Sequence, residues 1–199
     1  LASVEHRTIE GSLFAPSEIG LGTNNFGTRL DETESRAVVD AAIEAGINFF
    51  DTADIYGGGA SEDFLGRALG ARRKDVIVAT KFGHPTDLAG FSQGASPQWI
   101  REAVDESLRR LKTDYVDLYQ IHMPDRETPI VETLSALDDL VSSGKVRCIG
   151  TSNFAAWELV DADWTARAGD LARPVFAEYV WNLVEREIEG NVLSAARHL

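Results

Sequence analysis

Four side chains with complementary proton chemistry stand at or just after the ends of short apolar runs: Asp51, Tyr56, Lys81 and His122. Parallel strands bring their carboxyl ends to one edge of a sheet, so these strand ends would share one cavity. Each side chain alone also has a structural explanation. Asp51 could be a turn residue, Tyr56 packing, His122 a core histidine and Lys81 a solvated strand end. Together they would place a carboxylate, a phenol, an ammonium and an imidazole around one cavity.

This set of groups suits the reduction of a carbonyl. A nearby Asp51 keeps a buried Lys81 charged, and the charged lysine is expected to lower the pKa of the Tyr56 phenol. Tyr56 can then donate a proton to a carbonyl oxygen, and His122 can donate a hydrogen bond to the same oxygen. No Gly-x-Ser-x-Gly or His-Glu-x-x-His pattern occurs, which disfavours acyl transfer and zinc hydrolysis. The electrons would therefore come from a cofactor.

Six short apolar runs rich in β-branched residues predict the strands that position these groups. The predicted strands are Glu18–Leu21, Asn48–Asp51, Val76–Thr80, Val116–Gln120, Val146–Gly150 and Val175–Glu178. Their centres are separated by about 28–40 residues, roughly the length of one βα unit. Strands that alternate with helices indicate a mainly parallel sheet covered by helices.

Helical patterns fill the gaps between these runs. Three start signals are present: Asp31 with Glu34, Ser96-Pro97 and Thr128-Pro129, each read as an N-cap followed by a favoured first-turn residue. Gly46 and Gly144 stand where helix-terminating glycines belong. Weaker helical patterns cover Asp63–Leu69 and Ala156–Ala168.

Two architectures fit this alternation, an open doubly wound sheet and a (β/α)8 barrel. The glycines of Gly20–Gly27 do not have the spacing of a dinucleotide-binding fingerprint, and no phosphate-binding P-loop occurs. The barrel, an α/β TIM barrel, is therefore favoured. A complete one takes about 250 residues, whereas this chain has 199 residues and six predicted strands. We expect one barrel domain over residues 1–199, incomplete at its C-terminus, with no ladder between strands one and six.

Composition excludes several other classes. The net charge of −13 disfavours nucleic acids and anionic membranes as partners. The single cysteine, Cys148, rules out an intrachain disulfide or a multi-cysteine metal site, so no metal is expected. No apolar run reaches the length of a membrane span, and no signal segment is evident. We therefore expect a cytoplasmic protein whose partner is a small molecule. Its oligomeric state is left open.

A family resemblance rests on motifs in a fixed order. They are Asp51-Thr52-Ala53-Asp54-Ile55-Tyr56-Gly57, then Ser61-Glu62 and Leu65-Gly66, Thr80-Lys81-Phe82-Gly83, Ser107-Leu108-Arg109-Arg110-Leu111, Asp114-Tyr115-Val116-Asp117-Leu118, Gln120-Ile121-His122 and Gly150-Thr151-Ser152-Asn153-Phe154. Jointly these motifs resemble the aldo-keto reductase signature, from about Ile19 to Leu199. Each motif is weak alone, and the set is specific.

The resemblance implies a (β/α)8 barrel that binds NADPH (NADP+) in an extended form and reduces aldehydes or ketones. Carried over by position, the catalytic tetrad is Asp51, Tyr56, Lys81 and His122, with Tyr56 as the general acid. The residues implied to lie at the cofactor are Gly22, Thr23, Asp51, Ser152, Asn153 and Glu178. Of these, Ser152 and Asn153 resemble the pair that holds the nicotinamide carboxamide, and Gly22 and Thr23 the loop beside its ribose.

Glu178 departs from the family pattern, which often has glutamine at the end of strand six. A carboxylate accepts from an amide N–H but cannot donate, so either the contact changes or the register differs. The segment implied to bind the adenine and the 2′-phosphate is absent, so a preference for NADPH over NADH is implied by the family alone.

Two other functions remain as alternatives. One is a nucleotide-binding, redox-sensing subunit without significant turnover, which has less need of Tyr56. The other is a class I aldolase with Lys81 as a Schiff-base lysine, which a neighbouring Asp51 disfavours by keeping the amine protonated.

Further residues have weaker expectations. Phe26, Phe82 and Met123 are candidates for an apolar pocket wall, and each could equally be packing. His84 is expected at the surface, and Cys148 is expected to be a small, inert core residue.

Overall fold

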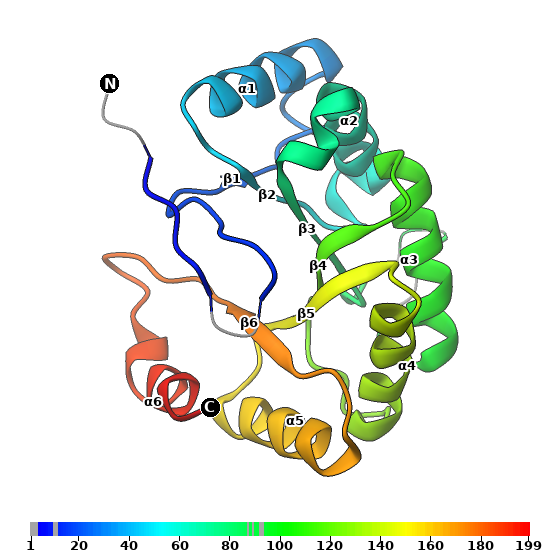
Figure 1. The fold of residues 1–199 in the computed structure, drawn as a ribbon, viewed down its shortest axis with the longest axis vertical. Helices are drawn as coiled ribbons and strands as arrows, with labels where there is room; N and C mark the ends of the chain where they lie inside the picture. The colour runs from blue at the N-terminus through cyan, green and yellow to red at the C-terminus, as the bar shows by residue number, and fades with distance from the viewer. Residues whose placement is uncertain (1–3, 10–11, 87, 89, 92–93) are drawn as a thin grey trace.

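The computed structural model describes residues 4–9, 12–86, 88, 90–91 and 94–199. Six parallel strands form one curved sheet: β1 (Leu21–Gly22), β2 (Phe49–Asp51), β3 (Ile77–Phe82), β4 (Val116–Ile121), β5 (Val146–Ser152) and β6 (Pro174–Glu178). The helices are α1 (Glu32–Glu44), α2 (Ala60–Leu69), α3 (Pro97–Leu111), α4 (Ile130–Ser142), α5 (Ala156–Gly169) and α6 (Val192–His198). Helices α1 to α5 line the outer side of the curve, and the N-terminal segment lies on its inner side (Figure 1).

The sheet has the strand order of an incomplete barrel. Its order is β1-β2-β3-β4-β5-β6, and each neighbouring pair is parallel. The expected α/β fold, with about six βα units of a (β/α)8 barrel, is confirmed. Within the described ranges no ladder joins β1 to β6, as predicted. In the same ranges, no helix combines the length and apolar character that a bilayer span requires.

Alternation along the strands separates the two faces of the sheet. Val78 and Phe82 of β3 belong to the large core beneath the helices, whereas Ala79 packs with Leu118 and Cys148 in a small inner cluster. Phe14 of the N-terminal segment packs on this cluster and stacks on Phe176, with 5.6 Å between the ring centroids. The inner face is thus apolar toward the start of the strands, and the polar residues are left at their carboxyl ends.

Of the three helix N-caps predicted from the sequence, two are confirmed. Asp31 and Glu34 form the expected capping box of α1, and the Ser96 side chain caps α3 at the Trp99 N–H. Helix α4 begins one residue later than expected, with Pro129 as its N-cap, because the Thr128 hydroxyl donates to Asp125 instead, at 2.6 Å.

The first strand was also misplaced, since the ladder contains Leu21–Gly22 and not Glu18–Leu21. The segment before Leu21 is held by hydrogen bonds that involve side chains and not by the strand ladder. The Ser17 N–H donates to the Asn48 side chain at 2.7 Å, and the Asn48 N–H donates to the Ser17 hydroxyl.

Gly66 allows two helices to approach closely. A Cβ at this position of α2 would lie 2.5 Å from the Leu111 carbonyl oxygen at the end of α3. Backbone atoms cannot move aside as a side-chain tip can, so the Leu65-Gly66 motif has a packing reason that is independent of the site.

Asp117 holds the start of the sheet together and offers a test of this packing. The carboxylate is 1% exposed. It forms ion pairs with Arg73 and Arg147, both at 2.8 Å, and accepts from the Val78 N–H at 3.0 Å. We expect Asp117→Asn to lower the free energy of unfolding by about 1.5–3 kcal/mol, because an amide cannot accept from both guanidinium groups.

Chemical denaturation measures this change. Asp105→Asn is the matched control, since Asp105 pairs with Lys145 at the surface and should change stability by less than about 1 kcal/mol. Equal effects of the two substitutions would contradict a structural role of Asp117.

Candidate active site

The tetrad residues lie together at the carboxyl ends of the strands. The Lys81 ammonium donates to both oxygens of Asp51, each at 2.6 Å, and to the Thr52 carbonyl at 3.1 Å. The ammonium lies 5.3 Å from the centre of the Tyr56 ring. The Tyr56 and His122 rings meet edge to face, with 5.8 Å between their centroids. Residues from three separate parts of the chain, Asp51 with Tyr56, Lys81 and His122, are therefore neighbours in space.

A glycine turn fixes the position of Tyr56. The turn is a short 3-10 segment, Tyr56–Gly59, that leads into α2. Gly57 has a φ of +59°, and a Cβ there would lie 2.6 Å from the Phe26 carbonyl oxygen. Glycine alone tolerates both the left-handed backbone and the close approach.

Lys81 faces two carboxylates. Besides Asp51, the Glu178 carboxylate lies 3.3 Å from its ammonium nitrogen. Burial lowers the pKa of Lys81, but Asp51 and Glu178 outweigh burial and the net direction is upward. The lysine therefore keeps its proton, as expected from the sequence. Burial raises the pKa of Asp51, Lys81 opposes this effect, and Glu178 adds to it.

The expected direction for Tyr56 was wrong. Its pKa is raised above the ordinary value, because burial outweighs the downward effect of Lys81, and Asp51 and Glu178 both raise it further. The phenol therefore holds its proton more firmly than the lysine alone would allow. A protonated phenol is the form that a proton donor requires.

His122 is neutral in this setting. The pKa of its imidazole falls to about 3 through burial and the nearby Lys81 and His84. A neutral imidazole has one N–H to donate, and the buried Nδ1 atom has no hydrogen-bond partner among the described residues. His84 was expected at the surface, but it is half-buried, with its ring centroid 4.7 Å from that of His122.

The two residues predicted beside the cofactor ribose have different surroundings. Gly22 is exposed, and a Cβ on it would meet no atom of the described chain within 4 Å. Thr23 is fully buried, and its hydroxyl bonds the Asp51 carbonyl at 2.9 Å and the Ser61 hydroxyl at 2.8 Å. The Thr23 side chain thus supports Asp51.

Ser152, Asn153 and Glu178 are adjacent on β5 and β6. Ser152 is paired with Glu178 across the ladder. The Asn153 amide donates to the Ser152 hydroxyl and to the His122 carbonyl, both at 3.0 Å. The hydroxyl, amide and carboxylate groups gathered at the ends of β5 and β6 fit a carboxamide-bearing ring such as nicotinamide. Glu178 is the last residue of β6, which is the strand end where the sequence analysis placed it.

Two of the predicted pocket-wall residues face elsewhere. Phe26 and Phe82 are 2% and 0% exposed, and both belong to the core beneath the helices. Phe82 precedes Gly83 at the end of β3 and alternates with inward Lys81, so its ring stacks on Tyr119 instead. Met123 is half-buried, and its place in a pocket wall stays a prediction. Cys148 is buried and lies in the inner cluster, as expected.

Sequence reasoning gave no role to several residues that support the site. Gln120, 1% exposed, donates to the Glu178 carboxylate at 2.9 Å. The sequence signal that could have found it is its position two residues before His122, which puts the two side chains on the same side of the chain at β4. Glu62 is fully buried and accepts from Thr80 and Arg110, both at 2.6 Å, which ties α2 to β3 and α3.

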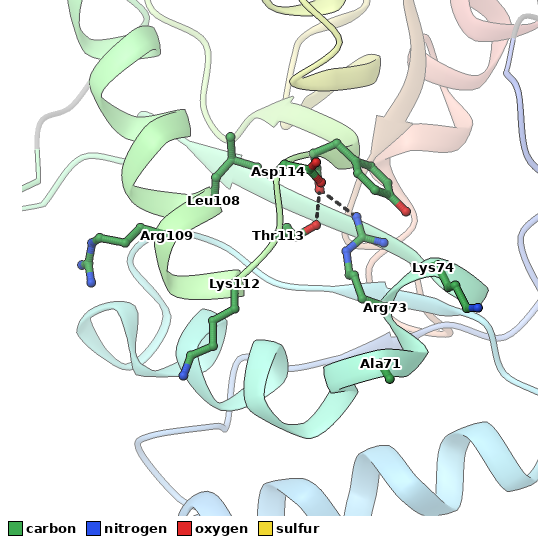
Figure 2. Close-up of a pocket in the computed structure, with 9 residues that line it drawn as sticks. Ala71, Arg73, Lys74, Leu108, Arg109, Lys112, Thr113 and Asp114 are labelled. Carbon is green, nitrogen blue, oxygen red and sulfur yellow. Dashed lines mark hydrogen bonds between the residues drawn. The ribbon is translucent and has the colours of Figure 1, made fainter.

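A depression of about 620 Å³ lies at the opposite end of the strands (Figure 2). Four cationic residues line it, but Arg109 and Lys112 point to one side and Lys74 to the other. The Arg73 guanidinium is bound to the Tyr115 carbonyl at 2.9 Å. Since these cations do not converge, the depression is a less suitable binding site than the tetrad end.

Comparison with known proteins finds one matching family and several similar relatives. A model of the Aldo/keto reductase family matches residues 18–199. An uncharacterized oxidoreductase of Bacillus subtilis, YrpG, is 41% identical over 92% of this chain and 60% of its own length. Aflatoxin B1 aldehyde reductase member 2 of Rattus norvegicus is 35% identical over 96% of this chain and 52% of its own.

A third relative has a different kind of name. A probable voltage-gated potassium channel subunit beta of Oryza sativa subsp. japonica is 38% identical over 81% of this chain and 50% of its own. The chain thus spans 50–60% of the length of these curated relatives.

Proposed function

The chain belongs to the aldo/keto reductase family, and from this premise we propose that the protein reduces an aldehyde or ketone to an alcohol with a nicotinamide cofactor. The observation that carries the proposal is the contact between the Asp51–Lys81 pair, the Tyr56 ring and a neutral His122. These groups can hold and deliver a proton, and none of them can supply electrons.

Each residue has a distinct task in this reaction. When bound, the cofactor supplies the hydride that the carbonyl carbon receives. The Tyr56 hydroxyl gives its proton to the carbonyl oxygen, and the phenolate that remains is stabilised by the ammonium of Lys81. Neutral His122 donates a hydrogen bond to the same oxygen and orients the substrate.

The nicotinamide end of the cofactor would be held by Ser152, Asn153 and Glu178, with Gly22 at the open loop after β1. The Glu178 carboxylate can accept from the carboxamide N–H, and the Ser152 hydroxyl can donate to its carbonyl. The preference for NADPH over NADH is part of this proposal. It is tested by comparing the two dissociation constants.

The direct test is a spectrophotometric assay with an aldehyde panel and reduced nicotinamide cofactor. We expect turnover that depends on both the aldehyde and the cofactor, with alcohol as the product. Cofactor binding without alcohol formation across the panel would contradict the reductase proposal.

The second candidate function is a redox-sensing subunit that binds the nucleotide without significant turnover. Cofactor binding without alcohol formation would favour it. The name of the rice relative supports considering it. The complete tetrad favours the reductase, because a binding protein has no need of a proton donor.

A Schiff-base lysine is the least compatible interpretation of Lys81. Its ammonium donates to Asp51 and Thr52 and is further stabilised by Glu178, and a protonated amine is not a nucleophile. Borohydride treatment with a carbonyl substrate is expected to leave no covalent adduct on Lys81. A trapped adduct, detected by mass spectrometry, would support the aldolase instead.

A further inference from the structure

The last residue of β6 adds a negative charge to the tetrad. Glu178 lies 3.3 Å from the Lys81 ammonium, which already donates twice to Asp51. One cation between two carboxylates leaves a local charge of −1 when both are ionised. The site is therefore more negative than a lysine–aspartate pair alone would make it.

The Glu178 carboxylate is held in this position. Gln120 of β4 donates to one of its oxygens at 2.9 Å, while the other oxygen faces Lys81. The ladder places Glu178 level with Ser152, and the Asn153 N–H donates to the Glu178 carbonyl at 3.2 Å. The backbone of this residue is thus fixed at the end of β5, and its side chain is fixed by Gln120 of β4.

Tyr56 is the group on which this charge acts. Lys81 from β3 and His122 after β4 lie beside its ring, and the charges of Asp51 from β2 and Glu178 from β6 raise its pKa through space. His122 is neutral, and the His84 ring lies next to it, with 4.7 Å between the ring centroids. Burial has the largest effect on the phenol pKa, and the balance between one ammonium and two carboxylates adjusts it further.

We propose that Glu178 is a positioning residue for proton transfer: it offsets the positive charge of Lys81, so that the phenol form of Tyr56, which carbonyl reduction requires, persists to higher pH. The inference rests on the proposed function for its catalytic meaning, and the effect on the phenol does not depend on turnover. Reduction needs the phenol and oxidation needs the phenolate, so the pH ranges of both directions should shift together when this charge is removed.

The first experiment measures the phenol directly. Ultraviolet difference titration of the wild-type protein against Tyr56→Phe, without cofactor, isolates the ionisation of Tyr56 from that of the other tyrosines. The titration is then repeated with Glu178→Gln against the double variant Glu178→Gln/Tyr56→Phe. Loss of the charge is expected to lower the pKa of the Tyr56 phenol by about one pH unit, the effect of one nearby charge.

Two variants separate charge from structure. Glu178→Asp keeps the carboxylate and should retain most of the wild-type titration. Glu44→Gln removes the same charge from the exposed end of α1 and should leave the phenol unchanged. An unchanged phenol in Glu178→Gln, or an equal effect of Glu44→Gln, would overturn the proposal.

The second experiment uses the reaction in both directions. In Glu178→Gln, the pH at which alcohol oxidation reaches its alkaline plateau should fall by about one unit if the phenol pKa falls by about one, because the phenolate then forms at lower pH. The alkaline decline of carbonyl reduction should move to lower pH by the same amount. A more acidic phenol in a protein without turnover would support the role of Glu178 while refuting the reductase. A more acidic phenol with unchanged pH profiles would refute that role in catalysis.

Discussion

Tyr56→Phe is expected to lower carbonyl reduction by at least about 100-fold, the lower end of the range for a positioned acid. The substitution removes only the hydroxyl, so the ring can keep its edge contact with His122 and its place beside Lys81. Cofactor affinity should therefore stay within a few-fold of the wild-type value. Steady-state rates and fluorescence titration of the cofactor measure the two quantities separately.

Tyr179→Phe is the matched control. The Tyr179 hydroxyl donates to the Phe154 carbonyl at 2.7 Å, away from the tetrad, so its loss should alter stability more than chemistry. Near-normal turnover by Tyr56→Phe would refute the assignment of the acid. A collapse of cofactor affinity in that variant would instead indicate a binding role.

Lys81→Met is expected to remove activity and to lower the free energy of unfolding by about 3–5 kcal/mol, the usual effect of breaking a buried ion pair. The ammonium is the only cation in direct contact with Asp51 and Glu178 within the described part of the chain. Without it, the largely buried Asp51 carboxylate loses its counter-ion and is left near a second carboxylate, the half-exposed Glu178.

The loss should depend on pH. Burial and Glu178 already raise the pKa of Asp51 while Lys81 opposes them, and removing Lys81 removes that opposition. A group with a raised folded-state pKa contributes most at low pH and loses that contribution as pH rises through this pKa. The Lys81→Met variant should therefore approach the wild-type stability in acid and diverge from it in neutral and alkaline buffers.

Lys145→Met supplies the comparison, because Lys145 pairs with Asp105 at the surface. It should change stability by less than about 1 kcal/mol. A Lys81→Met protein that melts like the wild type at neutral pH would show that Asp51 and Lys81 are not a buried pair in solution.

Much of the fold could be predicted from the sequence, because its signals are local. The helix starts at Asp31 and Ser96 depend on side chains that reach backbone groups within three residues, and both were confirmed. Strands that alternate with helices imply a parallel sheet whatever the details. The same alternation put Asp51, Lys81 and His122 at the carboxyl ends of consecutive strands.

Other features depend on contacts between distant segments. Whether Phe82 faces the pocket or the helices is decided by one step of strand alternation, and it faces the helices beside Tyr119. Thr128 was misread as a cap because Asp125 competes for its hydroxyl. The first strand was misread because Ser17 and Asn48, 31 residues apart, hold each other before the ladder begins.

The sequence by itself determined which chemical groups gather at the strand ends, because residue type and strand period are properties of the chain. It could not determine in which direction the pKa of Tyr56 moves. That direction is the sum of burial and of charges that arrive from β2, β3 and β6. Glu178 joins Gln120 across 58 positions and Lys81 across the curve of the sheet. Only the tertiary structure sets those distances, and electrostatic interaction depends on distance and burial.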